Sequence, residues 1–297
     1  ESRIAAWADD SAKLDRWLNS RGGSLEPALA EQKGAIIRLR DFFPSEIADA
    51  VLSVLEGLPE EAWDLSEQGG EEDAARHRFW SADLTDIPAL ASLRGVFWRM
   101  LKVHGGEPTL PIFSAGRYGA SDFIGRHDDR AHVPFFNDGN VYSRTVAAIW
   151  YLTRDWSAEE GGSLLDLEAK AKGGASPGEE EEASLVPVYN SMVVFEVPHM
   201  HAVSAVSAAR YRYSIFGWWH QKGKRYELPA QMHGAGEAEA PAKRNKGKKK
   251  KKRTGLVDEA PDSGEGFGLR RKVAKKKKTK LRGRAAGSDA RGEAAEE

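Results

Sequence analysis

The pattern of hydrophobic positions divides the chain into a helical first part and a strand-rich middle part. Up to residue 109, apolar side chains recur mostly at three- and four-residue spacings. This spacing predicts helices over 4–18, from Pro44 onward and over 87–104, with a short strand over 35–39. From about residue 110, short apolar runs are separated by Gly, Asp and Asn, which indicates strands.

Eight strands are predicted in the middle part. They cover 111–118, 122–127, 144–153, 163–168, 184–189, 191–197, 202–206 and 211–220. Eight short strands after a helical segment are typical of two packed sheets, as in a jelly roll. We therefore predict a mainly β fold with N-terminal helices, in which residues 1–109 support a β core of residues 110–222. The acidic run 178–182 is expected to be a solvated loop.

The composition and the charge both change beyond about residue 232. Residues 233–297 carry 20 Lys and Arg against 10 Asp and Glu, whereas residues 1–232 carry 24 against 35. The net charge of −1 therefore averages an acidic body and a basic tail. The tail has Phe267 as its only aromatic residue, so it cannot bury enough apolar surface to offset the entropy lost on ordering. We predict that residues 233–297 form a disordered basic tail.

The absence of cysteine restricts the chemistry that the chain can carry. It excludes disulfides, thiolate nucleophiles and zinc ribbons, so a metal ion would need His, Asp, Glu or backbone ligands. No apolar run approaches the roughly 20 residues that cross a bilayer, and no membrane partner is expected. The first residue is Glu1 rather than Met, which leaves a lost targeting segment open.

Three polar residues carry the candidate metal chemistry. His127 and Asp129 form an H-x-D step at the end of a predicted strand, and side chains two residues apart leave a strand on the same side. His201, from a distant strand, would complete a set of two imidazoles and one carboxylate. That set suits iron(II) and leaves other coordination positions open. The rival carboxylate is Asp128, which would point away from the metal in a regular strand; the rival imidazole is His199.

The sequence also offers a candidate binding residue for a carboxylate, Arg212. Arg212 lies eleven residues after His201, inside the apolar run 211–219. A charge in a core strand is costly unless it is paired, and a guanidinium binds a carboxylate through two parallel hydrogen bonds. Arg212 is therefore predicted to receive the far carboxylate of a dicarboxylate co-substrate. An Arg that faces outward or pairs with a fixed Glu is the alternative. The same spacing favours His201 over His199.

These segments occur in an order that resembles a known family. They are His127-Asp128-Asp129, the strand 144–152, the turn 160–164, the segment 201–206 and the segment 212–218. Together they resemble the Fe(II)/2-oxoglutarate-dependent dioxygenases of the prolyl 4-hydroxylase branch, with the nearest likeness to eukaryotic ribosomal-protein prolyl hydroxylases. The likeness covers roughly residues 110–222.

The resemblance implies a fold, a cofactor and a set of binding residues. The fold would be a double-stranded β-helix, with Fe(2+) held by His127, Asp129 and His201. The co-substrates would be 2-oxoglutarate and O2, and ascorbate is allowed as an accessory reductant. Arg212 would bind 2-oxoglutarate, and Tyr118, nine residues before the first ligand, would contact the same carboxylate, unless it is simply a core tyrosine. Ser214 would add a hydroxyl group.

The expected function is hydroxylation of a prolyl residue of a protein, with release of succinate and CO2. A ribosomal protein is the substrate that the likeness suggests. However, the ribosomal-protein hydroxylases carry a second β-helix domain where this chain has its basic tail. Another protein side chain or a small molecule therefore stays open as the substrate.

The basic clusters 243–253 and 270–284 indicate nonspecific nucleic-acid contact or binding of an import receptor, and a location in the nucleus or the cytoplasm. The tail also offers an alternative of a different class, a non-catalytic β-sandwich module that binds RNA through it. A cupin-like binding domain or isomerase is disfavoured, because it would not need Arg212 at this spacing.

Overall fold

The structure, a computed structural model, describes residues 3–21, 24–69, 76–134, 139–169 and 183–228, all of which lie in one compact unit of residues 1–238. The predicted acidic loop 178–182 and the predicted tail 233–297 fall outside the described residues. Within the described part, no helix is both long and apolar enough to span a membrane.

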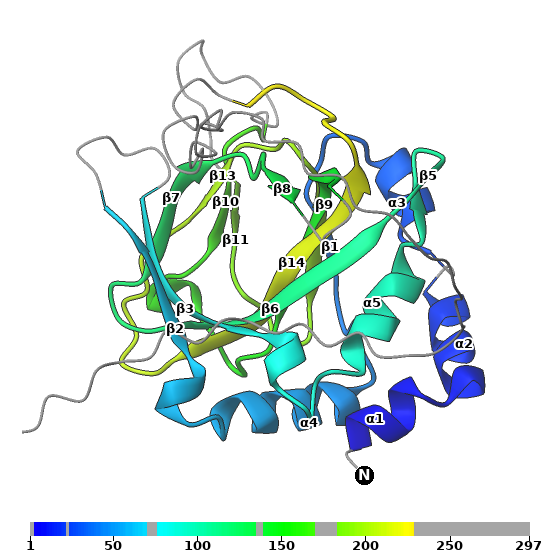
Figure 1. Cartoon of the computed structure of the whole chain (residues 1–297). Coiled ribbons are helices and arrows are strands. Elements are labelled where there is room, and N and C mark those ends of the chain that lie inside the picture. The colour runs from blue at the N-terminus through cyan, green and yellow to red at the C-terminus, as the bar shows by residue number, and fades with distance from the viewer. Residues whose placement is uncertain (1–2, 22–23, 70–75, 135–138, 170–182, 229–297) are drawn as a thin grey trace, which may run out of the picture. The chain divides into compact units, whose positions relative to one another are not determined.

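Among the described residues, the α-helices lie in the first hundred residues (Figure 1). They are α1 (Arg3–Ala8), α2 (Ser11–Ser20), α3 (Glu26–Glu31), α4 (Ser45–Glu56) and α5 (Leu93–Met100). The predicted helix 4–18 is in fact two helices, because the Asp10 side chain accepts the backbone N–H of Lys13 and so begins α2 as its N-cap. The predicted helix 87–104 is shorter than expected and is followed by a hairpin of β4 (Val103–His104) and β5 (Glu107–Pro108).

Each of the eight predicted strands has a counterpart in the structure, within a few residues at its ends. They are β6 (Leu110–Tyr118), β7 (Phe123–His127), β9 (Val141–Tyr151), β10 (Leu164–Asp166), β11 (Ala183–Leu185), β12 (Met192–Glu196), β13 (His201–Val203) and β14 (Arg212–Lys222). Four further strands join the same sheet: β1 (Ile37–Leu39), β2 (Asp64–Gln68), β3 (His77–Asp83) and β8 (His132–Pro134). Of these four, only β1 was predicted.

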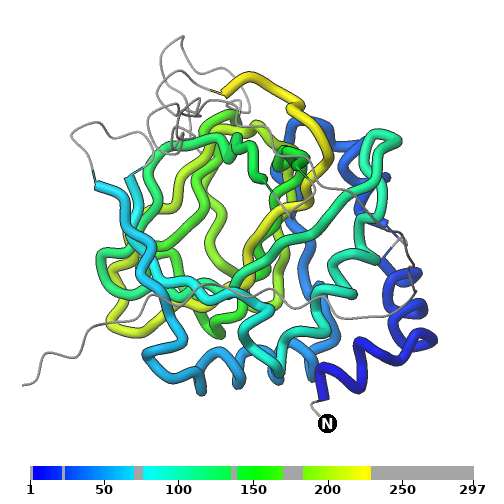
Figure 2. The backbone as a smooth tube through the Cα atoms, viewed as in Figure 1, coloured from blue at the N-terminus to red at the C-terminus, as the bar shows by residue number. Residues whose placement is uncertain are grey.

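The eight strands form two antiparallel four-stranded groups that curl toward each other (Figure 2). The long-strand sheet has the order β12-β9-β14-β6, and the short-strand sheet has the order β7-β13-β10-β11. Strand β3 joins them, because it pairs with both β6 and β7. Along the chain the strands pass back and forth between the two sheets. This topology confirms the predicted jelly-roll fold.

Two apolar clusters fill the two sides of the long-strand sheet. One cluster packs the outer face of this sheet against the helices and includes Trp150, Ile215 and Trp219. The other cluster lies between the two sheets and includes Tyr151, Phe195 and Val203. Neighbouring positions such as Trp150 and Tyr151 belong to different clusters, as the alternation of side chains along a strand requires. Every second residue along a strand of the long-strand sheet therefore faces the interior between the two sheets.

Candidate metal centre

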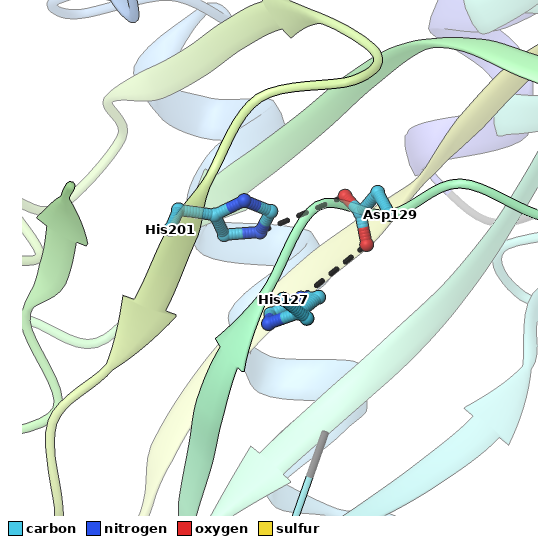
Figure 3. Close-up of side chains that lie close together, drawn as sticks. All are labelled: His127, Asp129 and His201. Atoms are coloured by element: carbon cyan, nitrogen blue, oxygen red, sulfur yellow. Dashed lines mark ion pairs between the residues drawn. The ribbon is translucent and has the colours of Figure 1, made fainter. Parts of the chain in front are cut away.

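His127, Asp129 and His201 converge at one end of the barrel interior (Figure 3). His127 ends β7, His201 begins β13, and the two residues are direct partners across the strand pair. One possible ligand atom from each of the three residues lies within 4.8 Å of the others. Asp129 Oδ1 is 3.3 Å from His127 Nε2, and Asp129 Oδ2 is 3.6 Å from His201 Nε2. The three residues selected from the sequence thus form one cluster.

The backbone fixes which nitrogen of each imidazole faces the cluster. His127 Nδ1 lies 2.8 Å from the carbonyl oxygen of Gly125, and His201 Nδ1 lies 2.7 Å from that of His199. A carbonyl can only accept a hydrogen bond, so each Nδ1 carries the proton and donates it. In the neutral ring, Nε2 then presents its lone pair to the centre, as a metal ligand must.

Asp129 reaches the cluster from a loop rather than from a regular strand. Strand β7 ends at His127, and Asp129 has a φ of 63°, in the left-handed region that Asp tolerates better than most residues. The expectation that two side chains would leave one regular strand end is therefore wrong in its geometry, although both residues meet at the cluster. Asp128 lies apart from it, since its carboxylate accepts the Arg130 Nε–H at 2.8 Å.

The electrostatics of the cluster favour an ionised carboxylate. Burial alone would raise the pKa of Asp129, but His201, His127 and Arg144 outweigh it and hold this pKa well below its usual range. Burial lowers the pKa of His201. For His127, the opposing effect of Asp129 outweighs burial and raises the pKa. An anion placed beside two imidazoles is the charge arrangement that a divalent cation requires.

His199, the rival imidazole, is buried and occupied elsewhere. Its Nε2 lies 2.7 Å from Asp166 Oδ1 on the neighbouring strand β10. Its ring and that of His201 both pack against Phe195, with centroids 5.6 Å and 4.8 Å away. His199 therefore supports the cluster through its backbone carbonyl, which accepts the proton of His201, and not through its ring.

Arg212 is buried in the barrel interior without a carboxylate partner among the described residues. Its guanidinium lies over the Tyr118 ring, with Cζ 3.9 Å from the centroid, and its Nη1 donates to the carbonyl oxygen of Gly162. Gly162 has a φ of 65°, which glycine adopts without strain. Arg210, by contrast, is exposed and binds Glu160 at the surface. The alternative in which Arg212 pairs with a fixed Glu is not seen.

Three buried polar atoms around Arg212 have no hydrogen-bond partner within the described part of the chain. They are Arg212 Nε, Ser214 Oγ and the hydroxyl oxygen of Tyr151. Ser214 is the direct cross-strand partner of Tyr151, and Arg212 is that of Tyr118. Unsatisfied buried groups are costly, and here a cation and two hydroxyl groups gather in one interior. They fit a carboxylate ligand.

Tyr151 is the member of this group that the sequence did not reveal. It ends an apolar strand and has no spacing that distinguishes it from a core tyrosine. Its significance comes only from the register that places it opposite Ser214. Burial raises its pKa, so its hydroxyl group stays protonated and can donate.

Arg144 and Trp218 lie beside the metal cluster. Arg144 Nη1 is 3.9 Å from Asp129 Oδ1, and its Cζ lies 3.5 Å from the Trp218 ring centroid. Among the described residues, Arg144 Nε and Trp218 Nε1 are also buried without a hydrogen-bond partner. An aromatic face with two donors thus borders the cluster.

Part of the chain is similar to a known protein family. Residues 113–220 match the family model of the 2OG-Fe(II) oxygenase superfamily. This segment runs from β6 to β14, so it contains all three cluster residues and Arg212. The match confirms the predicted resemblance over residues 113–220.

Two curated relatives match a short part of the chain. The prolyl 3-hydroxylase OGFOD1 of Xenopus laevis is 39% identical over 117 residues, which cover 38% of this chain and 20% of that protein. The prolyl 3,4-dihydroxylase OGFOD1 of Ostreococcus tauri is 39% identical over 93 residues, covering 29% and 18%. The chain thus spans about a fifth of the length of these relatives.

A solved structure of a prolyl hydroxylase from Trichoplax adhaerens, in complex with a hypoxia inducible factor peptide fragment, is also similar. It has a TM-score of 0.49 at 16% identity and covers 71% of this chain and 94% of that one.

Proposed function

We propose that this chain, whose residues 113–220 match the family model of the 2OG-Fe(II) oxygenase superfamily, is an iron(II)- and 2-oxoglutarate-dependent oxygenase that hydroxylates a prolyl residue of a protein. One observation carries the proposal. The His127–Asp129–His201 cluster and Arg212, with the unpartnered hydroxyl groups of Tyr151 and Ser214, lie inside the same barrel. We call Arg212, Tyr151 and Ser214 the carboxylate pocket. A metal-binding module alone would need the first feature but not the second.

The residues of the barrel would divide the work of binding. His127, Asp129 and His201 would hold iron(II), which when bound supplies the oxygen-activating chemistry. Arg212 would receive the far carboxylate of 2-oxoglutarate, with Tyr151 and Ser214 donating their hydroxyl protons to it. Tyr118 would keep the guanidinium in place through its ring. The buried interior would exclude water from the reacting groups.

The substrate side of the proposal rests on the aromatic wall and on the relatives. Arg144, stacked on the Trp218 ring, and Trp218 itself border the metal cluster, and Arg144 Nε and Trp218 Nε1 can donate to backbone carbonyls of a peptide. The curated relatives are named as prolyl hydroxylases, one for position 3 and one for positions 3 and 4. We therefore infer a protein substrate, with ribosomal proteins as the first candidates.

The test is turnover with a matched pair of arginine variants. Under air, with ferrous iron, 2-oxoglutarate and proline-containing peptides of ribosomal proteins, the wild type should release succinate and add one oxygen atom to a peptide. His127→Ala should lose both products, and Arg212→Ala should form much less of both at the same, limiting concentration of 2-oxoglutarate. Arg154→Ala, which removes an exposed guanidinium paired with Asp49, should keep them. Absence of succinate from the wild type, even with cell extract added, would sink the proposal.

The basic tail adds a proposal about location. Its two clusters, 243–253 and 270–284, fit an import receptor or a sequence-neutral contact with nucleic acid, so we propose a nuclear or cytoplasmic enzyme held near polyanions. Deletion of residues 243–284 should abolish nuclear accumulation of a fluorescent fusion. The competing module hypothesis predicts RNA affinity that survives His127→Ala together with no turnover in the wild type.

A further inference from the structure

The segment that follows β14 packs against the loop that carries Asp129. We call residues 223–228 the C-terminal strap; Figure 1 shows this yellow segment crossing the end of the sheet near β8. The strap lies beyond the predicted end of the β core at residue 222. At its start, the Gly223 N–H donates to the carbonyl oxygen of Val141 at 2.7 Å, and the Arg225 N–H donates to Ser143 Oγ at 3.1 Å.

The hydroxyl group of Tyr226 is the centre of the strap's contacts. It accepts the backbone N–H of Ala131 at 3.1 Å. Its proton faces two carbonyl oxygens, that of Ala131 at 3.0 Å and that of Arg144 at 2.9 Å. One phenol oxygen therefore ties the loop after Asp129 to the strand that carries Arg144.

These contacts lie on both sides of the interaction between Asp129, the proposed metal ligand, and Arg144. Ala131 is two residues after Asp129, and the Arg144 guanidinium faces the Asp129 carboxylate at 3.9 Å. Tyr226 thus holds the backbone on both sides of this interaction. Because Asp129 has a left-handed backbone outside any strand, the ladder of β7 does not fix its position. The loop is held to β9 by the Arg144 N–H, which donates to the carbonyl oxygen of Ala131 at 3.3 Å, and by the pairing of β8 with β9 from His132 onward. Tyr226 adds its hydroxyl contacts to these.

Two further contacts hold the strap itself against the loop. The His132 ring stacks on that of Tyr226, with centroids 5.2 Å apart and planes 14° apart, and His132 Nε2 lies 3.0 Å from the carbonyl oxygen of Tyr226. Arg130 Nη1 donates to the carbonyl oxygen of Glu227 at 2.9 Å. Three consecutive residues after the ligand, 130–132, are therefore bound to the strap.

We propose that Tyr226 is a positioning residue of the metal centre: its hydroxyl group holds the Asp129 loop in the conformation that binds the cation. This inference rests on the proposed function, because it presupposes that the His127–Asp129–His201 cluster binds a metal ion. Removal of a supporting hydrogen bond from a metal site typically weakens binding by about 10- to 100-fold. Tyr226 bonds to the backbone of Ala131, two residues after the ligand, rather than to the ligand itself, so we expect the lower end of that range.

The experiment measures cobalt(II) binding by the full chain, by calorimetry and by the visible absorption of the bound ion, with no 2-oxoglutarate present. Tyr226→Phe removes the hydroxyl oxygen and keeps the ring that stacks on His132. The matched control is Tyr189→Phe, which removes a phenol oxygen that bonds to Asp49 and Arg154 instead. The melting temperature of each metal-free variant shows whether the fold is kept.

We expect Tyr226→Phe to weaken cobalt binding by about tenfold and to alter the absorption band, while Tyr189→Phe binds as the wild type does. Equal binding by Tyr226→Phe and the wild type would overturn the inference and leave the proposed function standing. A wild type that binds no cobalt would overturn both. If Tyr226→Phe does not fold, His132→Phe gives the same test: unchanged binding there contradicts the inference, and weaker binding supports it.

Discussion

The two sheets of the barrel differ in what holds their residues in place. In the long-strand sheet, β9 and β14 have 11 residues each, and an apolar cluster with the helices covers its outer face. In the short-strand sheet, β10, β11 and β13 have 3 residues each. The metal ligands belong to the short-strand sheet and its loops, where single hydrogen bonds to carbonyl groups orient them.

This difference suggests that the long-strand sheet provides most of the stability, whereas the residues of the barrel interior provide metal and co-substrate binding. Long ladders and buried aromatic rings make the long-strand sheet the stable frame, and its inner face presents Arg212, Tyr151 and Ser214 at fixed register. The short-strand sheet gains less from its own ladder and depends on local polar contacts. Changes on the outer face of the frame should therefore cost stability, and changes in the interior should cost binding.

The largest effect is expected from Trp150→Ala on the outer face. Trp150 is fully buried, packs on Phe43 and donates its indole N–H to Asn190. Its loss should lower the free energy of unfolding by about 3–5 kcal/mol, a large share of a typical domain's total. Denaturant unfolding of the metal-free protein measures this. A loss below about 1 kcal/mol, the scale of a single hydrogen bond, would contradict the assignment of stability to this face.

His201→Ala, in the short-strand sheet, should cost more activity and less stability than Trp150→Ala. It removes a metal ligand, so succinate formation should fall to the background. The unfolding free energy of the metal-free protein should fall by about 1–3 kcal/mol, less than in Trp150→Ala, because the buried carbonyl oxygen of His199 loses its donor and Phe195 loses a packing partner. Turnover and denaturant unfolding of the same preparation check both parts. Turnover that persists in this variant would assign the ligand role to another imidazole.

Arg212 should affect binding of the co-substrate more than the chemical step. Arg212→Ala removes a charged hydrogen-bond donor, and such bonds contribute about 1.5–3 kcal/mol. The KM for 2-oxoglutarate should therefore rise by about 10- to 100-fold, and Arg212→Lys should fall in between, because lysine keeps the charge but not the two parallel donors. Steady-state kinetics with varied 2-oxoglutarate measure it. An unchanged KM in Arg212→Ala would show that Arg212 does not bind 2-oxoglutarate.

The smallest effects are expected from Tyr151→Phe and Ser214→Ala. Each removes a buried oxygen that has no hydrogen-bond partner among the described residues. The metal-free protein should keep or slightly gain stability, because no bond is lost. The KM for 2-oxoglutarate should rise by about 2- to 10-fold, the range for one neutral hydrogen bond. Destabilisation of the metal-free protein without any change in KM would mean that these groups serve the fold alone.

The eight core strands could be predicted because each carries an apolar run between turn residues. The hairpin of β2 and β3 could not, since β2 is the polar run Asp64–Gln68 and lies at the sheet edge with mostly exposed side chains. The predicted single helix 4–18 failed for a local reason, because a cap at Asp10 ends one helix and starts another. Such caps depend on a single side-chain contact.

The site also contains residues that could be predicted from the sequence and residues that could not. The H-x-D step, His201 and Arg212 carry spacings that can be read from the chain, and the structure brings them into one barrel. Tyr151 could not be found, since its role depends on cross-strand register with Ser214. Asp166 was also missed, because its contact with His199 joins residues 33 positions apart. Contacts of this kind exist only after the sheets have closed.

The most direct test of the account asks whether the metal cluster and the carboxylate pocket serve one ligand. Calorimetric titration of 2-oxoglutarate into the protein, with and without manganese(II) and in the absence of oxygen, measures this coupling. We predict one binding site that requires the metal, weaker binding in Arg212→Ala and wild-type binding in Arg154→Ala. Binding of 2-oxoglutarate that is equally strong without metal, or that survives Arg212→Ala unchanged, would contradict the account.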